Sequence, residues 1–397
     1  MITKLAFPAA FFLTVVTAFA EPSAEQLAGW LKRFPDADTN GDGVLSMAEA
    51  LDYRAKMQKS GRKGGAPREF KVDPGWEAER FPDHAVSYRS PEEIREIFGK
   101  VTSFPKPSGD VLRIVGTGHS FMAPGYGTLP KICRAAGFEQ PLLTHTGGGI
   151  TGSTRYKWEQ ENGIFQFDGK PEPKLLASIA NAEWEAMMWG PYFNDRPAYY
   201  ECWIDFCLKF NPAMKFYLSD AWPQLGQLDE IPATEDALTA EVIGQLGAEK
   251  NALYGGLVEL LNAKYPGKVF ILPTSDAMVL AAEHYLQGEL PGVEGLHRAL
   301  GQKEFSLWRD QLGHLGPGFE RLEGYVFYAT LYGRSPELIE NDIDFGRGKN
   351  TKSGFPNPEL DRRFRQIAWR AVANNPHSGV VDANENGVDD AREDKGS

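Results

Sequence analysis

The stretch VLRIVGTGHS (residues 111–120) places a short apolar run directly before a glycine-containing turn that carries a histidine and a serine. Val, Leu and Ile in a run of this length are typical of a buried strand, and the glycines indicate a tight turn at its end. The sequence therefore predicts a strand over residues 111–116 that is followed by an exposed Ser120. This serine is either a nucleophile at the end of a strand or a residue that caps the next helix.

Further apolar runs follow this one along the chain, and helical segments separate them. They predict strands over residues 141–146, 185–190, 215–219 and 268–273. The predicted helices cover residues 128–136, 196–210, 235–264, 275–287 and 318–333. Strands that alternate with crossover helices form parallel sheets covered on both faces. The expected fold class is α/β, a three-layer α/β/α sandwich of flavodoxin-like type with a five-stranded parallel sheet.

Composition limits the class of protein. The chain has 397 residues, of which 42% are hydrophobic, and this is enough apolar material for one large domain. Its net charge of −12 repels phosphate backbones, so we expect no nucleic-acid partner. Cys202 and Cys207 lie too far apart on a predicted helix to form a disulfide, and we expect buried free thiols. A disulfide, if one forms, would include Cys133.

The first residues, MITKLAFPAAFFLTVVTAFA, have the pattern of a secretory signal peptide. Lys4 precedes an apolar stretch, and Ala18 and Ala20 form the small-residue pattern of a cleavage site. We expect residues 1–20 to be removed after Ala20, which would make the protein periplasmic or secreted. The alternative is a membrane anchor, and no later segment is apolar enough to span a bilayer.

Residues 24–57 carry a calcium-loop motif between two predicted helical segments. Oxygen donors stand at the ligand positions of a twelve-residue loop, with Val44 contributing its backbone carbonyl: Asp38, Asn40, Asp42, Val44, Ser46 and Glu49. Gly43 stands where such a loop turns sharply, and Leu45 where it makes a hydrophobic contact. The motif resembles an EF-hand, and we expect residues 21–57 to bind a structural Ca²⁺. The alternative is a simple acidic turn.

A weaker copy of this motif lies near the end of the chain. Its ligand positions are Asp382, Asn384, Asn386, Asp390 and Glu393, with Gly387 at the turn. Asp389 stands where an apolar residue is usual, and the four residues that follow Glu393 are too few for an exiting helix. The alternative to a second calcium loop is a solvated, disordered acidic tail.

These motifs suggest how the chain is divided. Residues 58–107 are rich in glycine, proline and basic side chains, and we expect a linker or wrapping segment there. The α/β domain is expected over residues 108–345. The weaker calcium loop then lies in a C-terminal extension over residues 346–397.

Polar residues follow the predicted strands, and open parallel sheets bind ligands at that edge. Ser120 follows the first strand, Gly147–Gly149 the second and Asn194 the third, while Asp310 and His314 stand just before the last predicted helix. A serine esterase needs a nucleophile, a base, a carboxylate that orients the base, and donors for the oxyanion. Ser120, His314 and Asp310 can fill the first three roles. Backbone N–H groups of the glycines and the Asn194 amide can supply the donors.

This order of residues resembles the SGNH (GDSL-like) hydrolase superfamily of esterases and acetylesterases over residues 108–335. The resemblance implies that Ser120 is the nucleophile and an oxyanion donor, with Asp310 and His314 completing the triad. It also implies that the other donors are Asn194 and one of Gly147, Gly148 or Gly149. The chemistry of that family uses no metal, so we expect no catalytic cofactor.

The chain departs from the family pattern in three places. His119 stands where the family usually has an aspartate before the nucleophile. Three residues separate Asp310 from His314, where two are usual. Asn194 follows GPYF and does not sit in a compact Gly-x-Asn motif.

The sequence leaves several functions open. The first is an exported ester hydrolase that forms an acyl-enzyme on Ser120 and acts on a small-molecule or glycan ester. The second is a non-catalytic, calcium-binding protein of the cell envelope, or a glycan-binding protein, on the same fold. The third is a metal-dependent hydrolase with His119, Asp220, Asp276 and His314 as ligands.

Three aromatic residues lie near predicted strand ends, namely Trp189, Tyr192 and Trp222. They form either a platform on which a sugar stacks or part of the core packing. The sequence identifies neither the acyl group nor the oligomeric state.

Overall fold

The computed structural model describes residues 27–28, 31–32, 37–46, 48–49, 53, 90–92, 95, 106–107, 109–146, 156, 175–190, 197–345 and 354–393. The chain divides into two compact units, Met1–Phe70 and Lys71–Ser397. The predicted signal peptide and most of the predicted linker lie outside the described residues.

The second unit is built on a five-stranded parallel sheet with strand order β2-β1-β3-β4-β5. The strands are β1 (Ile114–Gly118), β2 (Leu142–Thr146), β3 (Ala186–Trp189), β4 (Lys215–Ser219) and β5 (Val269–Leu272). This is the order of a flavodoxin-like doubly wound sheet. The predicted fold class is therefore confirmed.

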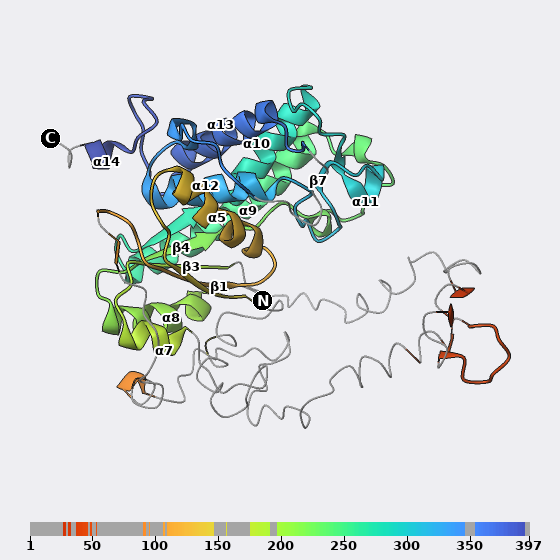
Figure 1. Ribbon diagram of the computed structural model, residues 1–397, viewed down its shortest axis with the longest axis horizontal. Helices are drawn as coiled ribbons and strands as arrows, with labels where there is room; N and C mark the ends of the chain where they lie inside the picture. Colours follow the sequence, from red (N-terminus) through yellow and green to blue (C-terminus); the bar gives the residue numbers. More distant parts are fainter. Residues whose placement is uncertain are drawn as a thin grey trace, which may run out of the picture. The chain divides into compact units, whose positions relative to one another are not determined.

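Helices form the two outer layers (Figure 1). One face of the sheet carries α7 (Leu176–Asn181) and α8 (Pro197–Phe210), and the other carries α5 (Ala123–Ala135), α12 (Glu320–Tyr332) and α13 (Pro358–Asn374). Two more helices, α9 (Ala240–Lys264) and α10 (Thr274–Leu286), flank β5 in the sequence. The layers leave the carboxyl ends of the strands at one edge of the sheet, where the candidate site lies.

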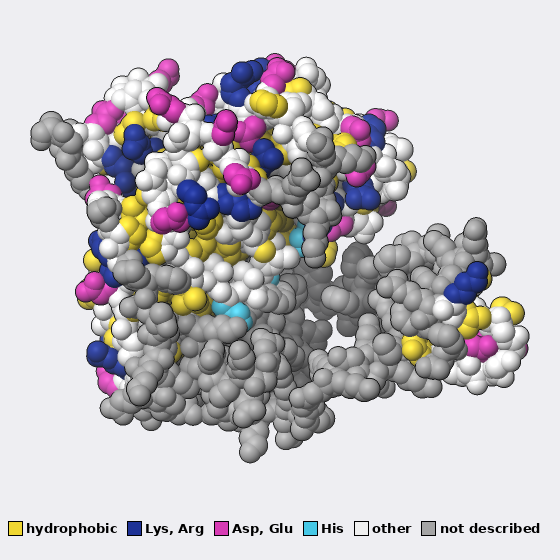
Figure 2. Space-filling view, in the orientation of Figure 1, with side chains coloured by type: hydrophobic (Ala, Val, Ile, Leu, Met, Phe, Trp, Pro, Cys, Tyr) yellow, Lys and Arg dark blue, Asp and Glu magenta, His cyan; other side chains and the backbone are white. Residues whose placement is uncertain are grey.

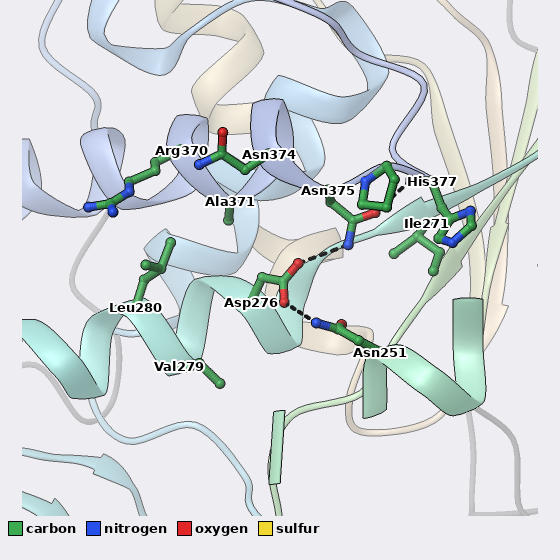
Figure 3. Close-up of a pocket in the computed structure, with 11 residues that line it drawn as sticks. Asn251, Ile271, Asp276, Val279, Leu280, Arg370, Ala371, Asn374, Asn375 and His377 are labelled. Atoms are coloured by element: carbon green, nitrogen blue, oxygen red, sulfur yellow. Dashed lines mark hydrogen bonds between the residues drawn. The ribbon is translucent and has the colours of Figure 1, made fainter. Parts of the chain in front are cut away.

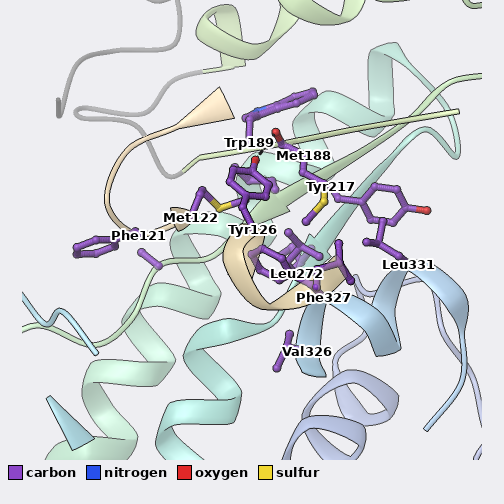
Figure 4. Packing of buried hydrophobic residues seen from close by; sticks show 14 of the residues in the cluster. Phe121, Met122, Tyr126, Met188, Trp189, Tyr217, Leu272, Val326, Phe327 and Leu331 are labelled. Atoms are coloured by element: carbon purple, nitrogen blue, oxygen red, sulfur yellow. Dashed lines mark hydrogen bonds between the residues drawn. The ribbon is translucent and has the colours of Figure 1, made fainter. Parts of the chain in front are cut away.

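Strand β1 begins at Ile114, three residues later than predicted, and continues through Gly118. The small residues at its end pair with the neighbouring strands, and the Tyr126 ring, which points toward Met188 in Figure 4, packs on Gly116. A Cβ at Gly116 would lie 2.6 Å from the Tyr126 ring. The Tyr126 hydroxyl also donates to the carbonyls of Thr117 and Met188, at 2.9 Å each. The helix after β1 is thus pinned to the strands that end beside Ser120.

Helix α5 begins at Ala123, five residues before the predicted start. Its glycines and prolines suggest a loop in the sequence, but Pro124 lies in the first turn, where a helix needs no N–H donor. Helix α13 was not predicted, although Asn357 caps it and Pro358 opens it. Those are ordinary signals of a helix start, so the sequence did contain the evidence for it.

A small two-stranded parallel sheet, β6 (Gly295–His297) and β7 (Ser306–Trp308), was also not predicted. The short helix α11 (Arg298–Gly301) connects its strands. Strands of three residues are too short to show a periodic pattern in the sequence. This sheet matters because β7 leads directly into the segment with Asp310 and His314.

Cys202 and Cys207 are buried free thiols, as predicted, and the Cys133 thiol is also buried and free. Among the described residues, no helix is both long and apolar enough to cross a membrane. On the face shown in Figure 2, basic side chains lie among acidic ones over the helices of the second unit.

Candidate active site

The turn after β1 carries Ser120 on an exposed position. Gly118 opens this turn with a φ of 134°. A Cβ at Gly118 would lie 2.8 Å from Met122 Cγ and 3.0 Å from the Gly190 carbonyl oxygen, so only glycine fits there. The Ser120 hydroxyl oxygen lies 2.7 Å from His314 Nε2. Nucleophile and base candidates are therefore within hydrogen-bond distance although 194 positions separate them.

The segment after β7 brings Asp310 and His314 together by a tight turn. Gly313 N donates to the Asp310 carbonyl at 2.9 Å, and Arg309 N donates to the His314 carbonyl at 2.8 Å. His314 Nδ1 lies 2.9 and 3.0 Å from the two carboxylate oxygens of Asp310. The turn thus accommodates the three intervening residues, and the unusual spacing does not separate acid from base.

The Asp310 carboxylate also orders the turn itself. It accepts hydrogen bonds from the backbone N–H groups of Leu312 and His314, at 3.2 and 3.3 Å. Partial burial tends to raise the pKa of Asp310, but the hydrogen bonds and charge of His314 outweigh it and hold that pKa below its usual value. An ionised Asp310 favours the tautomer in which Nδ1 carries the proton. Nε2 is then free to accept the proton of Ser120.

Gly313 is the residue that makes this turn possible, and replacing it gives a direct test. Its φ is +82°, and a Cβ there would lie 2.6 Å from the Pro223 carbonyl oxygen. Gly313→Ala should displace His314 and lower the turnover of an accepted ester by about ten- to a hundredfold. Steady-state kinetics checks this against Gly226→Ala, where a Cβ meets nothing within 4 Å. Unchanged turnover in Gly313→Ala would contradict this role.

Close packing of α5 against α12 brings the two halves of the site together. A Cβ at Gly125 would lie 2.2 Å from Phe327, and one at Gly324 would lie 2.2 Å from Thr128 Oγ1. These glycines let the two helix backbones approach closely. Helix α5 follows the serine turn and α12 follows the histidine turn. The helix contact therefore joins the two elements that follow Ser120 and His314 in the sequence.

Aromatic rings support the imidazole. Phe121 stacks on Trp222 with ring centroids 4.4 Å apart, and its ring lies edge-on to His314 at 5.2 Å. Trp222 is 1% exposed and Trp189 is 0% exposed, so both belong to the core packing and not to a sugar platform. Tyr192 lies outside the described residues. Sequence reasoning missed Phe121, although it directly follows the serine.

Two of the expected oxyanion donors, the Gly147–Gly149 loop and the Asn194 amide, lie outside the described residues. The backbone N–H of Ser120 has no hydrogen-bond partner in the described part of the chain. The N-terminus of α5 follows directly, and the helix dipole favours negative charge nearby. This edge of the sheet can therefore stabilise an anion.

The four residues considered as metal ligands do not come together. Asp220 is fully buried and accepts from Thr274 Oγ1 and Ser275 N, at 2.9 and 2.8 Å. Asp276 accepts from the amides of Asn251 and Asn375, at 2.7 and 2.8 Å. Nowhere in the described ranges do three or more His, Cys, Asp or Glu side chains form a group that could hold a metal ion.

Asp276 lies in the wall of a separate cavity of about 510 Å³ between α10 and α13 (Figure 3). Its carboxylate points between Asn251 and Asn375. None of the three candidate triad residues lines this cavity. Asp276 is therefore not the acid that orients His314.

The first calcium-loop motif belongs to the unit Met1–Phe70 and is largely described. Asp38 accepts from the N–H groups of Gly41 and Gly43, at 2.8 Å each. Glu49 accepts from side chains and N–H groups of the same loop, and its hydrogen bonds with Ser46 are the main reason why its pKa is lowered to about 2. Asp38 and Glu49 thus accept hydrogen bonds from N–H groups of their own loop.

The second motif is ordered against the body of the second unit, and the disordered-tail alternative is wrong up to Glu393. Ser335 N donates to the Gly387 carbonyl at 2.7 Å, and Asp389 N donates to the Gly333 carbonyl at 2.8 Å. The motif ends in a single helical turn, α14 (Asp390–Glu393), although no exiting helix was expected. Asp389 is 8% exposed and accepts from Val381 N at 3.2 Å, so a polar residue fits this buried position.

Comparison with known proteins finds no protein family and no curated protein that the chain matches. Among solved structures, the chain is similar to a DUF4886 family protein from Bacteroides uniformis. The similarity covers 67% of this chain and 96% of that one, with 13% identity and a TM-score of 0.47. A candidate platelet activating factor from Streptococcus pneumonia matches over 61% of this chain and 91% of its own, with 13% identity and a TM-score of 0.33.

Proposed function

We propose that the protein is a serine ester hydrolase of SGNH type that forms an acyl-enzyme on Ser120. One observation carries the proposal: Ser120 Oγ, His314 and Asp310 form a continuous hydrogen-bonded row, with contacts of 2.7, 2.9 and 3.0 Å. A nucleophile, a base and a group that orients the base are the parts that acyl transfer requires.

The proposed reaction has two steps. His314 Nε2 takes the hydroxyl proton as Ser120 Oγ bonds to the ester carbonyl carbon, and His314 then gives that proton to the departing alcohol as the ester C–O bond breaks. Water next adds to the acyl-enzyme, its proton passes through His314 to Ser120, and the acid leaves. The Ser120 N–H and the start of α5 would stabilise the oxyanion in both steps.

The proposed substrate is an ester on a small molecule or a glycan. The exposure of Ser120 supports access by a substrate that is part of a larger molecule. The expected export of the chain would bring it to carbohydrate outside the cytoplasm. An acyl group on a sugar is the form of substrate that we propose to test first.

A fluorophosphonate probe tests the chemistry independently of the natural substrate. It should label the wild-type protein at Ser120, as mapped by peptide mass spectrometry, and a panel of short-chain esters should be hydrolysed. His284 offers a matched control because it also pairs with a carboxylate, Glu289, at 2.6 Å. His284→Ala should keep both activities. A protein that neither reacts with the probe nor hydrolyses any ester would support the alternative of a binding protein.

We also propose that the loop Asp38–Glu49 binds a structural Ca²⁺ that takes no part in catalysis. The spacing of its oxygen donors supports this, because Ca²⁺ takes six to eight oxygen ligands in a loop of this spacing. The loop Asp382–Glu393 is the second candidate, with Glu393 accepting from the side chain of Asn384 at 3.1 Å.

Calcium titration should show binding to the first loop. Glu49→Gln removes one charged oxygen from the last ligand position and should weaken calorimetric Ca²⁺ affinity at that site by about tenfold or more. The control is Glu259→Gln, which changes a carboxylate that is 70% exposed. Probe labelling of Ser120 should persist in chelator. Affinity unchanged in Glu49→Gln would rule out this site.

A further inference from the structure

A carboxyl group lies buried in the contact between α5 and α12. Glu323 belongs to α12 and is 2% exposed. Its Oε2 atom accepts a hydrogen bond of 2.9 Å from Gly125 N, in the first turn of α5. Its Oε1 atom is buried and has no partner among the described residues. An ionised carboxylate would leave an unpaired negative charge in this buried contact, and such a charge costs free energy.

The hydrogen bond between Glu323 and Gly125 lies close in the sequence to the candidate nucleophile, Ser120. Only Phe121 and Met122 separate Ser120 from the start of α5. The N–H of Gly125 is one of the first in the helix, and these have no acceptor within the helix. Glu323 supplies that acceptor, while Phe327 packs against Gly125 from the next turn of α12. The first turn of α5 is therefore fixed against α12 by a hydrogen bond and by close packing.

The charged groups on the surrounding elements do not neutralise an ionised Glu323. The first turns of α5, APGYGTLP, hold no charged side chain. Of the cations on the neighbouring helices, Lys131 donates to the Phe345 carbonyl, Arg134 pairs with Glu139, Arg321 and Arg365 pair with Asp361, and Arg363 donates to Gln366. On α10, Asp276 is held by two asparagines and His284 pairs with Glu289. On α12, Glu320 adds a like charge.

Burial raises the pKa of Glu323 well above its usual value, the Gly125 hydrogen bond acts in the opposite direction, and the charge of Glu320 adds to the rise. Burial, the unpartnered Oε1 atom and the like charge of Glu320 thus all favour the protonated side chain.

We propose that Glu323 is a positioning residue that holds the first turn of α5, and with it Ser120, as a neutral carboxylic acid. The inference rests on the proposed function of Ser120. A neutral acid accepts the Gly125 hydrogen bond without placing a negative charge at the N-terminus of α5. The positive end of that helix then stays available for the oxyanion that develops on the substrate.

Two variants test this role by turnover. Glu323→Ala leaves Gly125 N without its acceptor and should lower kcat by about tenfold or more, with KM within about twofold of wild type. Glu323→Gln keeps the shape and an acceptor oxygen and should restore kcat to within about twofold. Glu359→Gln, an exposed change on α13, is the matched control. Hydrogen exchange of the peptide around Gly125 should be faster in Glu323→Ala and unchanged in Glu323→Gln.

A second measurement tests the neutral state without any substrate. Glu323 has a raised pKa in the folded protein, so wild type loses stability as pH rises from the unfolded value of about 4.3 towards the folded value. Glu323→Gln cannot ionise and avoids this loss. The two proteins should melt together near pH 4, and Glu323→Gln should melt higher by roughly 3 °C or more at pH 8.

The outcomes separate this inference from the proposed function. A wild type without esterase activity would refute the proposed function, while exchange and melting would still report on Glu323. Wild-type kcat in Glu323→Ala, or loss of kcat in both variants, would overturn the positioning role. A melting difference that stays constant from pH 4 to 8 would overturn the neutral state. If Glu323→Ala does not fold, the kinetics and melting of Glu323→Gln decide.

Discussion

Ser120→Ala should lower the turnover of an accepted ester by at least about a thousandfold and abolish labelling by a fluorophosphonate. The reason is that the hydroxyl lies 2.7 Å from His314 Nε2, and no other group in the described site takes its place as a nucleophile. Folding should be little affected because Ser120 is exposed and its side chain makes one hydrogen bond within the described part of the chain. Turnover and circular dichroism of the same preparation check both expectations.

His314→Ala should cost a similar factor, and the double variant should lose little more than either single one. Residues that act as one unit show such non-additive losses, because an unactivated hydroxyl attacks poorly at neutral pH. His284→Ala serves again as the control. If Ser120→Ala kept full esterase activity, or if the two losses multiplied, the proposed nucleophile and base would not form a unit.

Asp310→Asn should lower kcat by at least about a hundredfold, with a smaller effect on KM. An amide can donate to His314 Nδ1 and stabilise the tautomer that has its proton on Nε2, which cannot accept the proton of Ser120. The structure makes this expectation firm, because both carboxylate oxygens lie within 3.0 Å of Nδ1. Steady-state kinetics across pH 5–9 would measure the loss.

Asp276→Asn is the matched variant for this experiment, since Asp276 lies in the separate cavity and contacts two asparagines. It should leave kcat within about threefold of wild type.

Asp310 should also contribute to stability with a defined pH dependence. Its pKa is lowered in the folded protein, so its stabilising effect is present above the unfolded value of about 3.9 and is lost as pH falls through the folded value. The melting difference between wild type and Asp310→Asn should therefore shrink below about pH 4. Equal activity of Asp310→Asn and wild type would show that another group orients His314.

Local patterns in the sequence were enough to predict the class of the fold. Apolar runs bounded by turns marked all five strands of the main sheet, and in the central strands this is because a strand buried on both faces needs apolar residues. The same logic placed Ser120 at a strand end and drew attention to His314 and Asp310. Helix α13 was missed, although its asparagine cap and proline were readable. The short strands β6 and β7 could not be predicted, because three residues are too few to show a periodic pattern.

The geometry of the site was decided by the tertiary structure. The sequence could not show that a turn with positive φ at Gly313 makes the Asp310 to His314 spacing workable, because the close approach of Gly313 to Pro223 joins residues far apart in the chain. It could not show that Asp276 belongs to another cavity or that Glu323 is buried. Each of these facts depends on which helices pack together. The sequence determined which chemical groups stand at the ends of the strands. The packing of α5 on α12 decided which of those groups meet. That packing involves glycines whose neighbours lie far away in the chain. The sequence could not predict it, because contacts between distant residues leave no periodic signal.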